Sequence, residues 1–408
     1  MSDSPSRANQ SDMPPSDDNP SEDVFPSSIN SIKDLIKMVS GKDLSESDRV
    51  SDYGFAEKLP FPFSAIVGQH EMKLALILSL INPMIGGVLL IGPRGTGKTT
   101  AVRSLIPLLP MVGKGSCFYG CTEDDLLSEG TEAICEDCAQ KFAHNQPLTH
   151  MEPARLVELP LNAEINDVIG SLDDTLLPTN PMQFKRGILS KADRNLLLVD
   201  EINLLHNDIL DAILDASAYG SYTVRRGSLT ATLKSRFSMI GTMNPQEGFL
   251  RPQILDRFGL RVFANSLDTV NERYLAYQRS QTYRSYPYLL IKDFEEDTQK
   301  LAGDIANAQR LVGQMSIPED VAKLGIELIT SLKIPSIRAE ISLFEAAKAH
   351  AAADNRDRVT MLDLQAVAGI ALRMRTSPTA MTNDTERENE DLNIQSAMQS
   401  IFKLETTS

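Results

Sequence analysis

The chain has 408 residues, of which 42% are hydrophobic and 23% charged, so it is long enough for more than one domain with a buried core. Its 55 Asp and Glu residues outnumber its 40 Lys and Arg residues and give a formal net charge of −15. This acidic balance argues against a protein that wraps nucleic acid and against a polybasic membrane binder, because both need a basic surface.

Residues 1–57 are expected to form a disordered acidic extension, because a segment rich in Ser, Asp and Pro cannot bury enough apolar surface to offset its ordering entropy. The first ten residues lack the apolar centre of a secretion signal. Residues 74–92 are apolar, but an Asn-Pro pair and a Gly-Gly pair interrupt them, so we expect no insertion into a membrane. With only four cysteines, a cytoplasmic location is the expectation.

Five short apolar runs between residues 58 and 268 predict strands that are buried on both faces, as in the parallel sheet of an α/β domain. They lie at residues 88–91, 156–159, 196–199, 239–240 and 260–263. Beyond them, apolar residues recur at helical spacing, so residues 269–376 are expected to form a helical domain. The polar residues 377–408 are expected to be mostly disordered, with a last short helix near 394–404.

The sequence from Gly92 to Thr99 fits the phosphate-loop pattern G-x-x-x-x-G-K-[ST] completely. A predicted strand precedes it and a predicted helix follows it, so backbone amides and a helix N-terminus can surround phosphate groups. Lys98 is expected to reach the β- and γ-phosphates of ATP, and Thr99 to ligate Mg²⁺. The residues predicted to bind the nucleotide here are Gly92, Pro93, Arg94, Gly95, Thr96, Gly97, Lys98, Thr99 and Thr100.

Two adjacent carboxylates, Asp200 and Glu201, follow the apolar run at 196–199, and ligands bind at the carboxyl ends of such strands. We expect Asp200 to hold the Mg²⁺ shell and Glu201 to polarise the attacking water. Asn244 ends the next predicted strand, where a neutral amide can orient water near the γ-phosphate without adding charge. Solvated strand ends also carry carboxylates, so the pair is informative mainly because a phosphate loop precedes it.

Two arginines are candidates for stabilising the transferred phosphate. Arg257 lies in an Asp-Arg-Phe sequence at a predicted helix end, directly before the run at 260–263, and is expected to point outward. Arg338 opens a predicted helix in the second domain. For each of them, a structural arginine that caps a helix or pairs with a carboxylate is the alternative.

The cysteines form two close pairs, Cys117-x3-Cys121 and Cys135-x2-Cys138, within a loop at residues 115–140. Two such pairs can place four thiolates tetrahedrally around Zn²⁺, so a structural zinc site is the first hypothesis. Two disulfides, a redox switch and unmetallated thiols are the alternatives.

In this combination of motifs, the sequence resembles the AAA+ ATPases, and most closely the ATPase (I) subunit of magnesium chelatase and its cobalt-chelatase relatives. The resemblance runs over residues 58–375. The segments that carry it lie at residues 61–69, 85–88, 92–99, 168–173, 199–205 and 244–258.

The resemblance implies an AAA+ α/β domain with a helical lid, in subunits that form a homo-oligomeric ring with ATP at their interfaces. It assigns Asn244 to the sensor-1 position and Arg257 to the arginine finger that is donated to the neighbour's ATP. It assigns Arg338 to the sensor-2 position, and Gln69 to the segment that lines the adenine pocket.

The family that the sequence resembles couples ATP hydrolysis to metal insertion into a tetrapyrrole. The implied function is the motor subunit of a magnesium chelatase, which inserts Mg²⁺ into protoporphyrin IX in chlorophyll and bacteriochlorophyll biosynthesis. The implied partners are a D-type AAA+ subunit and a large H-type subunit that binds the porphyrin. Residues 162–180 and the hairpin-like Tyr219–Leu233 correspond to insertions typical of this branch.

Four other functions remain open at this point. The chain could be the ATPase of a cobalt-chelatase-like complex, or a remodelling chaperone for a protein client. An AAA+ protein that works on DNA is disfavoured by the net charge of −15. A ring that only binds nucleotide is disfavoured by the intact Lys98, Asp200, Glu201 and Arg257.

Overall fold

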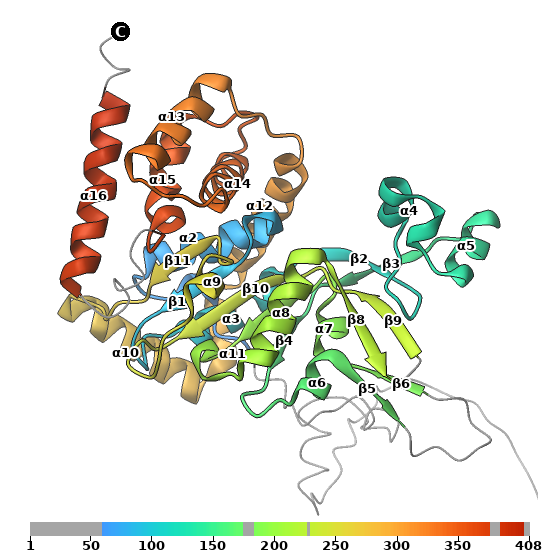
Figure 1. Cartoon of the computed structure of the whole chain (residues 1–408). Coiled ribbons are helices and arrows are strands. Elements are labelled where there is room, and N and C mark those ends of the chain that lie inside the picture. Colours follow the sequence, from blue (N-terminus) through green and yellow to red (C-terminus); the bar gives the residue numbers. More distant parts are fainter. Residues whose placement is uncertain (1–58, 174–182, 227–228, 376–383, 404–408) are drawn as a thin grey trace, which may run out of the picture. The chain divides into compact units, whose positions relative to one another are not determined.

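The computed structural model describes residues 59–173, 183–226, 229–375 and 384–403 (Figure 1). The chain from Leu59 onward is one compact unit. The extension predicted at residues 1–57 lies outside the described residues, as does part of the insertion predicted at 162–180.

The central sheet has five parallel strands in the order β11-β1-β10-β7-β4. The strands are Val88–Ile91 (β1), Leu156–Leu159 (β4), Leu196–Val199 (β7), Ser238–Met243 (β10) and Leu260–Phe263 (β11). All five apolar runs are strands of this sheet, so the prediction of a parallel α/β sheet is confirmed. Every residue of β1, β7 and β11 is buried, which explains why these strands are apolar throughout.

The register of the strands brings their carboxyl ends to one edge of the sheet. Val88 pairs with Ile240 on one side of β1 and with Leu260 on the other. Because the strands are parallel, the segments that follow β1, β7 and β10 meet at this edge. The phosphate loop, Asp200 and Asn244 all lie in those segments.

Two hydrophobic clusters cover the two faces of the sheet. Leu90 belongs to the first cluster and Leu89 to the second, as the period of two along a strand requires. The first cluster contains residues of α2 (His70–Ile81) and of helices that follow β11, and the second contains residues of α8 (Asn207–Tyr219). The sheet is therefore covered by helices on both sides.

Short elements complete the α/β part of the described chain. Its other helices are α3 (Lys98–Arg103), α4 (Glu123–Glu129), α5 (Glu136–Ala143), α6 (Ile165–Ile169), α7 (Ile188–Ala192) and α9 (Pro252–Leu255). Its antiparallel pairs are β2 (Met111–Gly115) with β3 (Thr149–Pro153), β5 (Gly170–Asp173) with β6 (Gln183–Arg186), and β8 (Ser221–Arg226) with β9 (Leu229–Lys234). The β8–β9 pair is the hairpin expected at Tyr219–Leu233.

The described chain after β11 is helical, apart from an isolated bridge between Ser316 and Arg358. Its helices are α10 (Val270–Ser285), α11 (Pro287–Asp293), α12 (Glu295–Val312), α13 (Glu319–Ser331), α14 (Arg338–Ala353), α15 (Met361–Leu372) and α16 (Asp384–Lys403). Helices α12 to α16 share the first hydrophobic cluster with α2, so the boundary expected at residue 268 separates sheet from helices but does not separate two cores. None of the described helices has the length and apolar character that a membrane span requires.

Helix α16 corrects the expectation that residues 377–408 are mostly disordered. Residues 384–403 form one helix, which starts well before the short helix expected near residue 394. Ile394, Ile401 and Phe402 are at most 6% exposed and belong to the first cluster, and Figure 1 shows α16 (red) beside α13 and α15. The expectation failed because a narrow apolar stripe at helical spacing is hidden in a polar, acidic composition.

Arg373 connects the beginning of this fold to its end. Its Nη1 donates to Oε2 of Glu71, in the first turn of α2, at 2.8 Å. Its Nε donates to Oδ1 of Asp391, in α16, also at 2.8 Å. The side chain is only 6% exposed, so these two carboxylates balance a charge that is nearly buried.

Replacing Ile394 by Ala should lower the free energy of unfolding by about 2–5 kcal/mol, because it leaves a cavity in the first cluster. Leu392→Ala is the matched control, since Leu392 lies in the same helix but is 61% exposed. Thermal and denaturant unfolding of both variants measures the difference. Equal, small effects would mean that α16 does not contribute to the core.

Candidate functional site

The phosphate loop leaves the carboxyl end of β1 and enters α3. Gly95 (φ 84°) and Gly97 (φ 85°) have left-handed backbones, which residues with a Cβ rarely adopt. A Cβ on Gly92 would lie 2.4 Å from the carbonyl oxygen of Ala264, so only glycine fits where the loop begins. The glycines of the pattern are therefore required by the local backbone.

Lys98 bridges the start of the phosphate loop. Its Nζ donates to the carbonyl oxygens of Gly92 at 2.7 Å and of Pro93 at 2.8 Å. Burial lowers the pKa of this amine, while the carboxylate of Asp200 and two further carboxylates act in the opposite direction. The amine can exchange the two carbonyl oxygens for phosphate oxygens.

Thr99 and Asp200 are hydrogen-bonded across the pocket. Thr99 Oγ1 donates to Asp200 Oδ1 at 3.0 Å and lies 3.2 Å from Oδ2. The hydroxyl of Thr242, in β10, also donates to Asp200 Oδ1. A hydroxyl and a carboxylate are the hard oxygen ligands that Mg²⁺ takes beside phosphates, so this pair fits the predicted metal.

Glu201 follows Asp200 with a left-handed backbone (φ 48°), and its N–H donates to Thr242 Oγ1 at 3.1 Å. Its carboxylate Oε1 lies 3.2 Å from Nη2 of Arg94, a residue predicted to bind nucleotide as part of the phosphate loop. The Arg94 side chain is 70% exposed and reaches a second carboxylate, that of Glu247. In the described state, Arg94 thus pairs with acidic side chains.

A cavity of about 200 Å³ brings most of the predicted residues together. It is lined by Arg94, Gly95, Gly97, Lys98, Thr99, Thr100, Asp200, Glu201, Thr242, Met243 and Asn244. Three residues of the predicted loop, Gly92, Pro93 and Thr96, do not line it. Thr96 instead closes the turn, with its hydroxyl donating to the carbonyl oxygen of Pro93 at 3.0 Å.

Two residues of this site, Thr242 and Glu247, are not among those predicted from the sequence. Thr242 is 1% exposed and contacts both Asp200 and the backbone of Glu201. Glu247 accepts a hydrogen bond from Asn244 Nδ2 at 2.8 Å. The sequence signal for Thr242 is a polar residue within an otherwise apolar strand. The signal for Glu247 is its position in the segment 244–258, which carries the family resemblance.

Gln69 lines a second cavity, of about 390 Å³. The walls of this cavity come from the start of α2, from the segment after β11 and from α16. Gln69 Nε2 donates to the carbonyl oxygen of Asn265 at 2.6 Å. Because β11 is paired with β1, the cavity lies at the same sheet edge as the phosphate loop.

Arg257 lines neither of these two cavities. Its Nη1 donates to the carbonyl oxygen of Leu214, in α8, at 2.6 Å, and its Nη2 lies 3.5 Å from Asp215 Oδ1. The side chain is 28% exposed. It is therefore outside the pocket of its own phosphate loop and partly open to solvent.

Arg338, the first residue of α14, also lies outside both cavities. Its Nε is 3.9 Å from Oδ2 of Asp256, the residue that precedes Arg257. Asp256 also accepts hydrogen bonds from Ser336 Oγ and from Arg375 Nη1, each at 3.0 Å. Arg338 therefore lies beside the residue that precedes Arg257 in the chain, while the Arg257 side chain is directed to α8.

The thiols of all four cysteines lie within 4.8 Å of one another, and none forms a disulfide. A hydrogen bond with Cys121 lowers the pKa of the Cys117 thiol to about 4, whereas burial raises the pKa of the Cys138 thiol to about 12. Thiols this close resist ionising together unless a cation balances their charge. We call residues 116–148, which carry them between β2 and β3, the cysteine module.

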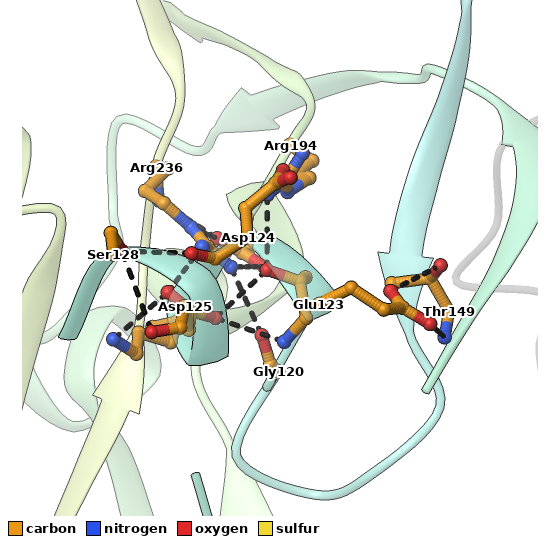
Figure 2. A network of polar contacts seen from close by, with 11 residues as sticks. Gly120, Glu123, Asp124, Asp125, Ser128, Thr149, Arg194 and Arg236 are labelled. Carbon is orange, nitrogen blue, oxygen red and sulfur yellow. Dashed lines mark hydrogen bonds and ion pairs between the residues drawn. The ribbon is translucent and has the colours of Figure 1, made fainter. Parts of the chain in front are cut away.

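A polar network attaches the cysteine module to the α/β core (Figure 2). Arg236, between β9 and β10, donates through Nη1 to Asp125 Oδ1 at 2.9 Å and through Nη2 to the carbonyl oxygen of Gly120 at 3.0 Å. On the other side of α4, Glu123 Oε2 accepts from the hydroxyl of Thr149, at the start of β3, at 2.8 Å. The module is thus held by charged hydrogen bonds at two points.

Part of the chain matches a known protein family. The AAA lid domain family matches residues 322–394. The matched segment includes α14 and α15 and continues into α16.

Known relatives cover most of the chain. A homolog of the magnesium-chelatase subunit ChlI from Methanocaldococcus jannaschii is 39% identical over 322 residues, which are 78% of this chain and 86% of that protein. The magnesium-chelatase 38 kDa subunit of Cereibacter sphaeroides is 38% identical over 325 residues, which are 79% of this chain and 94% of that protein. The crystal structure of a candidate ATPase from Cytophaga hutchinsonii superposes with a TM-score of 0.52 at 20% identity. The match covers 83% of this chain and 91% of that chain. At this identity, it supports only a similarity of fold.

Replacing Thr242 by Val should weaken Mg²⁺-dependent nucleotide binding by about 10- to 100-fold, because it removes a hydroxyl that orients a metal ligand. Nucleotide binding without Mg²⁺ should change little. Titration with a fluorescent ATP analogue, with and without Mg²⁺, measures both. The control is Thr223→Val, whose hydroxyl is bonded to Thr232 in the β8–β9 hairpin. An equal loss with and without Mg²⁺ would contradict the role of Thr242 in holding Asp200.

Proposed function

Because the chain belongs to the magnesium-chelatase I-subunit family of AAA+ ATPases, we propose that it is the motor subunit of a chelatase that inserts Mg²⁺ into protoporphyrin IX, in chlorophyll and bacteriochlorophyll biosynthesis. The family uses ATP and Mg²⁺. The observation that carries the proposal is one pocket that unites the phosphate loop, the Thr99–Asp200 pair, Glu201 and Asn244.

The residues of this pocket divide the work of phosphoryl transfer. Lys98 would hold the β- and γ-phosphates in place of the loop carbonyls, and Thr99 and Asp200 would hold Mg²⁺, which neutralises charge on the phosphates. Glu201 would polarise the attacking water, and Asn244 would orient it by its amide. Such a site works by positioning and charge stabilisation, which requires fixed side chains more than a nucleophile.

The base of the nucleotide would enter the second cavity beside Gln69. This cavity adjoins the phosphate loop along the sheet edge, and about 390 Å³ is within the range of small-molecule sites. Its position supports the assignment of Gln69 to the adenine pocket.

Both Arg257 and Arg338 would act on the nucleotide of a neighbouring subunit. Neither lines the phosphate pocket of its own chain, and Arg338 lies beside Asp256, the residue that precedes Arg257. If each active site needs arginines from the adjacent subunit, ATP hydrolysis depends on assembly. The chain would therefore work as a homo-oligomeric ring.

The other partners proposed are a D-type AAA+ subunit and a large H-type subunit that holds the porphyrin. Reconstitution with these subunits, scored by Mg²⁺ and by Co²⁺ insertion, tests the proposal against a cobalt-chelatase-like complex.

The net charge of −15 fits protein partners better than nucleic acid. Four unpaired cysteines fit a reducing cytoplasm.

Replacing Arg257 by Ala should lower ATP turnover by about 10³-fold or more and leave nucleotide affinity nearly unchanged. Mixing Arg257→Ala with Glu201→Gln subunits should restore part of the turnover. In such a ring, a Glu201→Gln subunit offers its intact Arg257 to the intact pocket of an Arg257→Ala neighbour. Steady-state ATPase assays over a range of mixing ratios measure this recovery.

Arg251→Ala is the matched control, since Arg251 contacts Asn207 and Asp211 on the same helix α8 and should be dispensable for turnover. Two inactive variants that stay inactive at every ratio would show that Arg257 does not act between subunits.

We also propose that the cysteine module holds a structural Zn²⁺ ion through Cys117, Cys121, Cys135 and Cys138. The cluster of four free thiols is the observation that supports it. Besides two of these cysteines, the buried hydrophobic cluster of the module contains only Ile134 and Leu148. A segment with so small a core needs another source of stability, which a tetrahedral metal site supplies.

The full-length protein, purified without chelator, should contain one zinc ion per chain by elemental analysis. Cys138→Ser should lose the metal and should unfold at a lower temperature. Leu127→Ala, which is in the same module but 84% exposed, should keep it. A metal-free wild type, or one with disulfides, would refute the zinc site and leave the ATPase proposal untouched.

A further inference from the structure

Glu247 is the residue of the nucleotide site that the proposed mechanism leaves without a role. It lies in the turn after β10, where its N–H donates to the carbonyl oxygen of Asn244 at 3.0 Å. Its Oε1 accepts two further hydrogen bonds, from Asn244 Nδ2 at 2.8 Å and from Arg94 Nε at 2.7 Å. One carboxylate oxygen thus connects the turn after β10 to the phosphate loop.

The contacts of Asn244 determine how its amide is oriented. The backbone N–H of Gln246 donates to Asn244 Oδ1 at 3.2 Å, while Asn244 Nδ2 donates to Glu247 Oε1. An amide nitrogen has two N–H donors. With one bound to Glu247, the other stays available to a water or a phosphate oxygen in the pocket that Asn244 lines.

Arg94 extends the same connection to Glu201. Its guanidinium bonds Glu247 through Nε and Glu201 Oε1 through Nη2, at 3.2 Å. The carboxylates of Glu201 and Glu247 therefore share the guanidinium of Arg94. The position of Glu201 then depends on where Glu247 holds that guanidinium. The Arg94 side chain is 70% exposed, so these pairs contribute little to stability and their main effect is on position.

The Glu247 side chain is also costly to keep where it is. It is 23% exposed, and its Oε2 is buried without a hydrogen-bond partner in the described part of the chain. An unsatisfied buried carboxylate oxygen destabilises a fold. A residue that costs stability beside a catalytic pocket is typically retained for function.

We propose that Glu247 is a positioning residue for ATP hydrolysis, which orients the Asn244 amide directly and the Glu201 carboxylate through Arg94. This inference rests on the proposed ATPase activity of the same pocket. It assigns Glu247 no contact with the reacting atoms. Lys98, Thr99 and Asp200 do not depend on this bridge, so binding of the nucleotide should not require it.

The test compares Glu247→Gln with Glu247→Asp in the full-length chain. Glu247→Gln keeps the shape and one acceptor but loses the charge that holds Arg94, and should lower kcat by about 10- to 100-fold. The Kd for nucleotide and the Tm should stay close to the wild-type values. Glu247→Asp keeps the charge on a shorter stem and should recover part of kcat. Gln246→Ala is the matched control, since it keeps the backbone N–H that donates to Asn244 Oδ1.

A double variant tests the route. If Glu247 acts through Asn244, the losses of Glu247→Gln and Asn244→Ala should be far from additive in kcat. A Glu247→Gln variant with wild-type kcat overturns the inference, as does one whose nucleotide affinity and Tm fall in step with its activity. Wild-type protein that binds ATP but never hydrolyses it, alone or with its partner subunits, would instead overturn the proposed function as well.

Discussion

The carboxylate of Asp200 is the point on which the nucleotide site depends. It follows β7 and accepts hydrogen bonds from Thr99, at the end of the phosphate loop, and from Thr242 in β10. Because β1, β10 and β7 are neighbours in the sheet, one side chain joins three adjacent strand ends. The spacing between the loop that would hold phosphate and the carboxylate that would direct water is therefore set by the sheet itself.

Much of this arrangement could be predicted from the sequence, because its causes are local. Strands such as β1 are buried on both faces and must be apolar throughout, so the pattern reveals them. The glycines of the phosphate loop are dictated by backbone angles at Gly95 and Gly97. Thr242 and Glu247 were not predicted, because each acts through a side chain from a distant segment, Asp200 for Thr242 and Arg94 for Glu247, and only the fold brings these partners together.

The remaining differences also come from contacts between distant segments. The cysteine spacing indicates four clustered thiols, but nothing in it indicates that Arg236 attaches the module through Asp125. The resemblance names Arg257 and Arg338, yet the contact of Arg338 with Asp256, the residue before Arg257, is visible only in the fold. Composition likewise misjudges α16, whose few apolar residues matter because α13 and α15 present a surface to them.

The hold of Arg373 on Glu71 and Asp391 has a consequence for biosynthesis. Through Arg373, helix α2 at the start of the described chain is joined to helix α16. Until a ribosome has added α16, the emerging polypeptide exposes the apolar surface that this helix will cover. The first cluster is therefore covered only after α16 has been synthesised, and a pause in translation before that point would leave its apolar surface open to aggregation.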